Sequence, residues 1–451
     1  GWLRHMLLAL AGLQVIILFN TASRGAILAV VGASGLAALL WMMESGKRGR
    51  MRAAALLAAL LILVGGFWLA KDNDWITAHP IWGRIASISL DELQVRFTLW
   101  NMAIDGIVER PLVGYGHEGF NYVFNSEYRP ELYVQEPWFD RAHSAFVDWM
   151  VVGGIPAFLL FVSLLFVAAL ALYRSPAVTP LERIMLGAAL AAYALQALVV
   201  FDNLFSYIPL AAILAYIHHR SSHPITALDV LPATGKGQAQ AIIMPVAGAV
   251  AIFLILTVNM PSMRAANDLV YAISPIQGGP SENKARFEKA LSDDSFATQE
   301  IREQLVNYAA NLASQQNVPE QLRGEFVMLA IAEMNKEIER APHDARLRIE
   351  AALIYRAIGD YESALGEVTI AERLSPMRQN FILERGTVLM TAGRHEEARD
   401  AYLAAYALSP QFSELAIYAA SGYLLTGEDV KAEELLTQHL GTTTVDHPAL
   451  V

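Results

Sequence analysis

Seven long apolar runs constrain this chain more than any other feature of its sequence. They cover residues 3–19, 26–43, 53–70, 145–173, 184–200, 204–217 and 241–259. Each run is long enough, or nearly so, to cross the hydrocarbon core of a bilayer, which is about 30 Å thick. The composition agrees, because 55% of the residues are hydrophobic and the mean hydropathy is +0.35. We therefore predict an all-α protein built on a polytopic transmembrane helix bundle of about seven spans.

The basic residues set the expected orientation of these spans. The segment 47–52 follows the second run and carries four cations, and such clusters stay on the cytoplasmic side of a membrane. The later cytoplasmic turns are also basic, through Arg174, Arg183, His218, His219 and Arg220. The opposite side then receives residues 20–25, the long loop 71–143, the turn 202–203 and everything after Pro261.

Charge is distributed unevenly along the chain. Residues 1–260 carry 16 Lys and Arg against 16 Asp and Glu, whereas residues 261–451 carry 17 against 28 and so hold the whole net charge of −11. We therefore predict two domains: a transmembrane domain over 1–260, with a large outer loop at 71–143, and a soluble domain over 261–451. Neither part is basic enough to indicate nucleic acid as a partner.

The chain has no cysteine, which excludes thiol catalysis and thiolate zinc sites.

The soluble part repeats with a period of 34 residues. The repeated positions are Gly359, Gly393 and Gly427, then Ala364, Ala398 and Ala432, and then Pro342, Pro376 and Pro410. A Gly that closes one helix, a small Ala that lets two helices approach and a Pro that ends the pair resemble the tetratricopeptide repeat. Stacked helical repeats usually bind a protein partner, although an anchoring domain without a ligand is the alternative. Residues 283–340 are expected to be helical without the period.

The long outer loop is expected to be structured. Residues 89–109 predict an amphipathic helix, because Leu93, Phe97, Trp100, Ile104 and Ile107 recur at three- and four-residue steps. The segment 111–116 ends this helix in a turn. A structured loop of this size is more often functional than a mere connector.

Three residues on the predicted outer side are candidates for a site. Arg24 lies between the first two runs, where the charge rule depletes cations. Arg96 lies on the amphipathic helix, and His143 ends the long loop. Two arginines can hold a diphosphate through charge-assisted hydrogen bonds, and a histidine can take a proton from a hydroxyl near neutral pH. Taken singly, each arginine could instead reach lipid headgroups, and the histidine could be a helix cap.

No metal site is predicted. His218, His219 and His223 resemble a metal cluster only in composition, because they lie in a cytoplasmic segment without cysteine. Asp72-Asn73-Asp74 has the spacing of an acidic metal motif but no supporting context.

The order of several short motifs resembles the O-antigen ligase and O-antigen polymerase superfamily. These motifs are Thr21-Ala22-Ser23-Arg24-Gly25-Ala26, Arg96-Phe97-Thr98-Leu99-Trp100, Glu109-Arg110-Pro111-Leu112-Val113-Gly114-Tyr115-Gly116, and His143 at the start of the next span. The likeness covers residues 3–220, and Ser144 stands where Asn is common in the superfamily. Members usually have more spans than the seven found here. The resemblance therefore implies that the missing spans precede Gly1 and that this chain is truncated at its N-terminus.

The resemblance implies glycan transfer on the periplasmic face of the bacterial inner membrane. The donor would be a glycan on undecaprenyl pyrophosphate, with Arg24 and Arg96 holding the pyrophosphate and His143 acting as base on the acceptor hydroxyl, so that the anomeric carbon inverts. The scheme requires no metal and no cofactor, because the arginines neutralise the developing charge. The repeat domain would also be periplasmic.

The same resemblance leaves the acceptor open. Transfer to the lipid A core would make the protein an O-antigen ligase of lipopolysaccharide biosynthesis. Transfer to another glycan would make it a polymerase, and transfer to a protein would make it a protein O-oligosaccharyltransferase.

Two other functional classes compete with an enzyme. A transporter or flippase predicts charged residues within the spans and symmetry between halves, but the span cores are nearly free of charge. A non-catalytic scaffold that recruits glycan-assembly enzymes through its repeats predicts that Arg24, Arg96 and His143 are dispensable.

Overall fold

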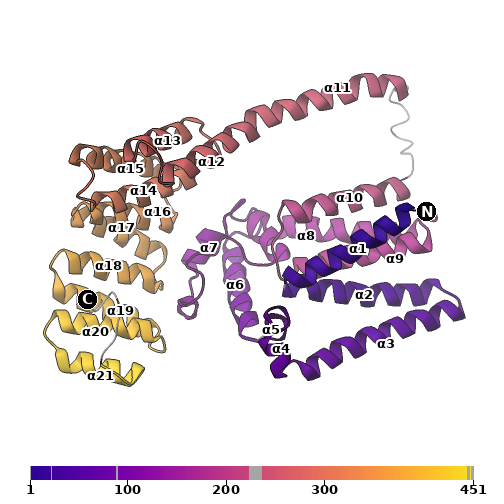
Figure 1. Cartoon of the computed structure of the whole chain (residues 1–451), viewed down its shortest axis with the longest axis horizontal. Helices are drawn as coiled ribbons and strands as arrows, with labels where there is room; N and C mark the ends of the chain where they lie inside the picture. The colour runs from indigo at the N-terminus through magenta and orange to yellow at the C-terminus, as the bar shows by residue number, and fades with distance from the viewer. Residues whose placement is uncertain (1, 22, 88–89, 223–235, 444–446, 448–451) are drawn as a thin grey trace. The chain divides into compact units, whose positions relative to one another are not determined.

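The computed structural model describes the chain except residues 1, 22, 88–89, 223–235, 444–446 and 448–451. His223, one of the discounted metal candidates, lies outside the described residues. All regular elements in the described ranges are helical, which confirms the predicted fold class (Figure 1). The chain forms two compact units, the first made of residues 1–124 and 138–225 and the second of residues 125–137 and 226–451. The second unit thus includes a short piece of the long loop.

The helices of the first unit follow the apolar runs and the long loop. Their bounds are α1 Trp2–Thr21, α2 Arg24–Glu44, α3 Lys47–Ala70, α4 Asp74–Ala78, α5 Pro80–Ala86, α6 Leu90–Glu109, α8 Ala145–Arg174, α9 Pro180–Ala197 and α10 Leu204–Ser221. Helix α7, Phe120–Ser126, ends where the second unit begins.

Five helical segments in the described ranges are long and apolar enough to cross a membrane. They are Trp2–Thr21, Arg24–Glu44, Lys47–Ala70, Ala145–Arg174 and Ala241–Ile273. The other two predicted spans form α9 and α10, which have 18 residues each and carry polar residues in their terminal turns. Many apolar side chains on the five segments are exposed, for example Ile62 at 72% and Leu69 at 88%, as expected for helices surrounded by lipid or by further helices.

Helices α2 and α9 pack against each other in opposite directions. Small residues allow this approach, because a Cβ atom on Gly25 would lie 3.2 Å from Val199 Cγ2 and one on Gly32 would lie 2.7 Å from Leu195 Cδ1. At the other end, a Cβ on Gly187 would lie 3.1 Å from Leu40 Cδ1. This packing brings the first turn of α2 to the C-terminal end of α9.

The predicted helix of the long loop is confirmed as α6, and its apolar stripe is only partly buried. Phe97 and Ile104 are 54% and 51% exposed, whereas Leu99, Met102 and Ala103 are buried. Periodicity finds an apolar stripe, yet in a membrane protein such a stripe can face lipid instead of the core.

The predicted turn at 111–116 does more than end α6. Helix α8 breaks at Gly153 and Gly154, the latter with φ +67°. The break leaves the Val151 and Val152 carbonyls without their helical partners, since Ile155 N–H donates to Pro111 O at 2.8 Å and Pro156 has no N–H. The loop replaces them: Tyr115 N–H donates to Val151 O at 2.7 Å, and Gly116 N–H donates to Val152 O at 3.0 Å.

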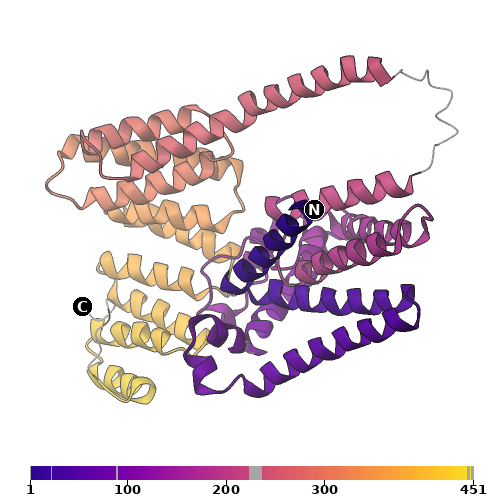
Figure 2. The ribbon, with the colours of Figure 1, turned by 45° about the vertical axis from the view of Figure 1, so that its right-hand side comes forward.

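The second unit is a stack of helix pairs. Helix α11, Lys236–Leu254, continues through a π-helical turn, Ile255–Asn259, into α12, Met260–Ile273. The pairs follow one another in both views (Figures 1 and 2). They are α12 with α13 Pro280–Ser292, α14 Thr298–Ala313 with α15 Glu320–Arg340, α16 Ala345–Ala357 with α17 Tyr361–Leu374, α18 Gln379–Thr391 with α19 His395–Leu408, and α20 Ser413–Leu425 with α21 Asp429–Leu440.

The 34-residue period corresponds to repeated local geometry. Gly359, Gly393 and Gly427 follow the first helix of their pairs with φ of +81°, +76° and +74°. Each closes its helix in the same way; Gly359 N–H donates to Arg356 O at 3.1 Å, and Asp360 N–H donates to Tyr355 O at 3.0 Å. These two hydrogen bonds, together with the positive φ, define the left-handed helix cap that favours glycine. The repeated alanines are at most 1% exposed, as close helix contact requires.

Candidate functional site

Arg24 is the first residue of α2 and reaches to the end of α5. Its Nε donates to Arg84 O at 2.7 Å and its Nη2 donates to Ser87 Oγ at 3.0 Å. The N-cap residue Ser23 makes no side-chain capping bond. Because Arg24 is the first residue of α2, it lies at the positive end of the dipole of that helix.

Arg96 and Trp100 lie one turn apart on α6 and hold two separate segments of backbone. Arg96 Nη1 donates to Val199 O, just after the end of α9. Trp100 Nε1 donates to Ala142 O at 3.0 Å. The four-residue spacing places both side chains on the same face of the helix. The spacing of Arg96 and Trp100 in the motif 96–100 is thus explained by the two backbone carbonyls that they bind.

His143 has a left-handed backbone with φ +55°. Its ring lies between Phe139 and Phe201, edge to face with each at 5.5 Å between centroids. Its Nδ1 is 3.3 Å from Arg141 O. A non-glycine residue in this conformation is strained by about 1–3 kcal/mol, and such strain persists where surrounding contacts fix the backbone.

Those contacts are found on both sides of His143. Ala142 N–H donates to Asp148 Oδ1 at 2.9 Å, Ser144 Oγ lies 3.4 Å from Ala197 O, and Ala145 N–H donates to Val200 O at 3.2 Å. Ser144 is buried, and its hydroxyl binds the end of α9 in place of capping α8. The segment around His143 is therefore fixed to the end of α9.

The structure brings the three predicted residues to one region of the first unit. Arg96 binds Val199, His143 packs on Phe201, and the first turn of α2, which begins with Arg24, packs against Val199 and Val200 through Gly25. Residues 196–201, at and just after the end of α9, thus contact Arg96, His143 and the helical turn that carries Arg24. Gln196 Oε1 is buried there without a hydrogen-bond partner.

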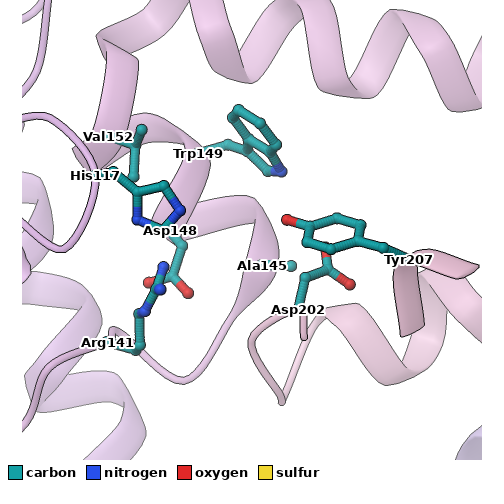
Figure 3. Close-up of a pocket in the computed structure, with 8 residues that line it drawn as sticks. All are labelled: His117, Arg141, Ala145, Asp148, Trp149, Val152, Asp202 and Tyr207. Atoms are coloured by element: carbon teal, nitrogen blue, oxygen red, sulfur yellow. The ribbon is translucent and has the colours of Figure 1, made fainter. Parts of the chain in front are cut away.

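A cavity of about 60 Å³ lies beside this region (Figure 3). Its lining residues are His117, Arg141, Ala145, Asp148, Trp149, Val152, Asp202 and Tyr207. In Figure 3, His117, Asp148 and Arg141 lie on one side and Asp202 and Tyr207 on the other. This volume holds a few water molecules or one small polar group, whereas pockets for drug-sized ligands measure about 300–1,000 Å³. None of Arg24, Arg96 and His143 is among its lining residues.

The two carboxylates of the cavity differ in how they are held. Asp202 accepts from Tyr193 Oη and from Ser206 Oγ, both at 2.7 Å. Asp148 is buried and accepts from Ala142 N–H through Oδ1, while its Oδ2 has no hydrogen-bond partner. Asp148 thereby joins the cavity to the backbone next to His143.

Sequence reasoning missed the cavity and the break in α8. Asp148 and Asp202 stood at outer ends of predicted spans, and an acidic residue at a span end is the signal that could have marked them. The break had a signal as well, since Gly153-Gly154 and Pro156 interrupt an otherwise apolar run.

Comparisons with known proteins find a family likeness in each part of the chain. A family described as O-antigen ligase matches residues 8–162, a segment that contains Arg24, Arg96 and His143. A tetratricopeptide repeat family matches residues 349–413 and 383–441. No curated protein matches the chain.

Two solved structures are also similar to part of the chain. They are titled "MamA MSR-1 C2" and "MamA AMB-1 P212121", with 16% and 17% identity and TM-scores of 0.26 and 0.25. The matches cover 39% and 42% of this chain and 95% and 96% of those chains. The N-terminal part of the chain is thus similar to the O-antigen ligase family, and its C-terminal part is similar to tetratricopeptide repeats.

Proposed function

We propose that the protein transfers a glycan from undecaprenyl pyrophosphate to an acceptor hydroxyl on the periplasmic face of the bacterial inner membrane. The observation that carries this proposal is the convergence of the first turn of α2, Arg96 and His143 on the end of α9. The match of residues 8–162 to the O-antigen ligase family supports it independently.

The two arginines would bind the pyrophosphate. A guanidinium has five N–H donors in a planar fork, and one or two bonds to fixed partners orient that plane. Arg96 is oriented by Val199 O, and Arg24 by Arg84 O and Ser87 Oγ. Preorganised cations of this kind stabilise the charge that develops on a departing diphosphate, and the α2 dipole adds to the positive potential at Arg24.

His143 would act as the base. A hydrogen bond from Nδ1–H to Arg141 O selects the tautomer whose lone pair is on Nε2. The acceptor oxygen attacks the anomeric carbon while its proton passes to Nε2. The bond from that carbon to the pyrophosphate oxygen breaks, the electron pair leaves with the diphosphate, and the new glycosidic bond has the inverted configuration. His143 then returns the proton to solvent.

Asp148 would act as a positioning residue. Through Ala142 N–H it holds the backbone that carries His143 in its left-handed conformation. The cavity next to it is too small for a sugar, so the donor and the acceptor glycan would bind outside it, against the same end of α9.

The proposed orientation rests on the basic segment 47–52 at the start of α3, because such segments stay on the cytoplasmic side of a membrane. The loop 71–143 would then be periplasmic. Because the chain lacks cysteine, a single Val113→Cys substitution gives one reactive thiol, at a side chain that is 75% exposed. A membrane-impermeant reagent added from the periplasmic side should label it in intact cells. Labelling that appears only after lysis would contradict the proposed orientation.

The direct test uses the purified full chain in lipid nanodiscs with undecaprenyl-pyrophosphate-linked glycan. Three acceptors would be offered in parallel: lipid A core, a second lipid-linked glycan, and a Ser/Thr-rich protein. We expect glycan to appear on one acceptor in step with the release of undecaprenyl pyrophosphate. The acceptor that reacts distinguishes a ligase from a polymerase or a protein oligosaccharyltransferase. Donor that remains intact with all three would refute the proposal.

A further inference from the structure

The tetratricopeptide repeats hold a segment of the chain that is not a repeat. Residues 125–137, the middle of the long loop, belong to the second unit and contain a short 3-10 turn, Pro130–Leu132. Tyr133 is 9% exposed and forms part of the apolar core that includes Leu383 and Leu415. Its ring also lies 5.6 Å from that of Phe412. The segment is therefore packed into the repeats and does not merely lie on them.

Polar contacts fix both ends and the middle of the segment. Arg378 Nη1 donates to Asn125 Oδ1 at 2.7 Å, and Arg378 Nη2 donates to Pro137 O. Gln379 Nε2 donates to Pro130 O at 2.9 Å, and the hydroxyl of Ser409 lies 3.3 Å from the same carbonyl. A single guanidinium thus joins the first and last residues of the segment.

Arg378 differs from the residue at the equivalent position of the preceding repeat. One period earlier, the same position is Asp344, whose Oδ1 caps α16 by accepting from Arg346 N–H at 2.9 Å. Arg378 occupies the N-cap of α18 and makes no capping bond. Losing such a cap costs about 1 kcal/mol, so the repeat gives up local stability at this position.

Burial makes an accidental contact implausible at Arg378. The side chain is 1% exposed and lies over the rings of Tyr128 and Phe381, at 5.4 and 4.7 Å. Burial lowers the pKa of Arg378 to about 10, which still leaves the group charged at neutral pH. A buried cation is stable only where hydrogen bonds replace its water, and here Asn125 and Pro137 supply them.

We propose that the edge of the repeat stack formed by Arg378, Gln379, Ser409 and Phe412 is a docking surface for the chain's own segment 125–137. This docking positions the part of the loop that runs on from Pro137 to His143. Arg378 is thus a positioning residue for the transfer reaction. The docking stands on the contacts alone, whereas the positioning role rests on the proposed function.

Cross-linking tests the docking without reference to activity. Tyr133→Cys and Phe412→Cys in the cysteine-free full chain should be joined in native membranes by a short bifunctional thiol reagent. The control pair combines Tyr133→Cys with Val430→Cys on α21, where the side chain is 69% exposed. We expect at least a tenfold higher yield for the first pair. Equal yields would overturn the docking.

A matched pair of arginine variants tests the anchor. Arg378→Ala should lower the cross-linking yield several-fold. Arg385→Ala on the same helix, which removes an ion pair with Glu372, should not. Asn125→Ala removes the partner of Arg378 on the loop segment and leaves the core of the repeats unchanged, and it should lower the cross-linking yield as well. A yield unaffected by Arg378→Ala and by Asn125→Ala would overturn the role of the anchor.

Rescue separates positioning from a general loss of folding. In the nanodisc assay, Arg378→Ala should lower kcat, and cross-linking Tyr133→Cys to Phe412→Cys in that variant should restore it at least in part. Unchanged kcat, or a loss that cross-linking does not restore, would overturn the positioning role. A wild-type chain without transfer would instead refute the proposed function and the positioning role with it, while the cross-linking yields would still decide the docking.

Discussion

The two units of the chain use charged side chains in different ways. In the repeats, charges mostly pair with each other between helices, as Arg302 does with Glu333 and Glu337. In the first unit several charges instead hold irregular backbone, as Arg96 does at Val199 O and Asp148 at Ala142 N–H. Pairs between regular helices adjust stability, whereas contacts to irregular backbone fix the position of a neighbouring group. Apart from Arg378, which holds loop backbone, substitution of a charged repeat residue should therefore change stability, whereas substitution of a charge that holds backbone in the first unit should change activity.

The largest effect is expected at His143. Asparagine tolerates the left-handed backbone, so His143→Asn removes the base and keeps the conformation. We expect glycan transfer to fall by about 10²- to 10⁴-fold at an unchanged Tm, as measured with nanodisc-embedded protein. His143→Ala in parallel should also lower the Tm. Near-normal transfer by a well-folded His143→Asn variant would remove this residue from the mechanism.

A smaller but still large loss is expected for Arg96→Lys. Lysine keeps the charge but not the planar fork that can bind Val199 O and a phosphate together. Transfer should fall about 100-fold, with undecaprenyl pyrophosphate binding weakened as well. The control is Arg84→Ala, which removes an exposed cation and keeps the carbonyl that accepts from Arg24. A wild-type transfer rate in Arg96→Lys, as in the Arg84→Ala control, would show that the guanidinium of Arg96 does not position the donor.

Gly154→Ala tests whether the broken α8 helix matters to the first unit. The added Cβ would lie 2.4 Å from Pro111 O at a residue with φ +67°. We expect destabilisation by about 2 kcal/mol or more, seen as a lower Tm in detergent. Gly65→Ala, whose Cβ would meet nothing within 4 Å, is the matched control and should be neutral or slightly stabilising. Equal melting temperatures for the two variants would mean that the contact with the 111–116 turn is not tight.

The smallest effect belongs to the repeats and concerns pH. Burial, with the nearby Glu303 carboxylate, raises the pKa of Glu350 from 4.5 to about 7, while Arg346 and a hydrogen bond from Asn307 oppose the shift. Because this pKa is raised on folding, the stability linked to it is present at acidic pH and is lost as the pH rises through 7.

Glu350→Gln should therefore be more stable than wild type at pH 8, by on the order of 2 kcal/mol, and nearly equal to it at pH 5. Hydrogen exchange of the α16 amides at both values would measure the difference. The same advantage at both pH values would show that Glu350 does not titrate in this range.

The sequence predicted the repeats better than the site, for a physical reason. Gly359 and its equivalents act within a few residues, so their spacing alone indicates the helix caps. The break at Gly153 and Gly154 depends on Pro111 and Tyr115, some 40 residues earlier. Such long-range pairing leaves only a weak local signal.

Two further features lay beyond sequence reasoning. The buried residues of α6 could not be told from its apolar stripe, because apolar periodicity does not distinguish a core from lipid. Arg378 was missed because its partners, Asn125 and Pro137, lie some 240 to 250 residues away. The motifs that suggested Arg24, Arg96 and His143 located the region but not residues 199–201, against which Arg96, His143 and the first turn of α2 pack.

The central claim, lipid-linked glycan transfer that depends on His143, is tested most directly by the glycans of a strain that lacks this gene. Complementation with wild type and with His143→Asn would be compared by mass spectrometry of lipopolysaccharide, polysaccharide chain length and glycoproteins. We predict that one of these three products is lost or shortened on deletion, returns with wild type and does not return with His143→Asn. Three unchanged products on deletion, or full restoration by His143→Asn, would contradict the account.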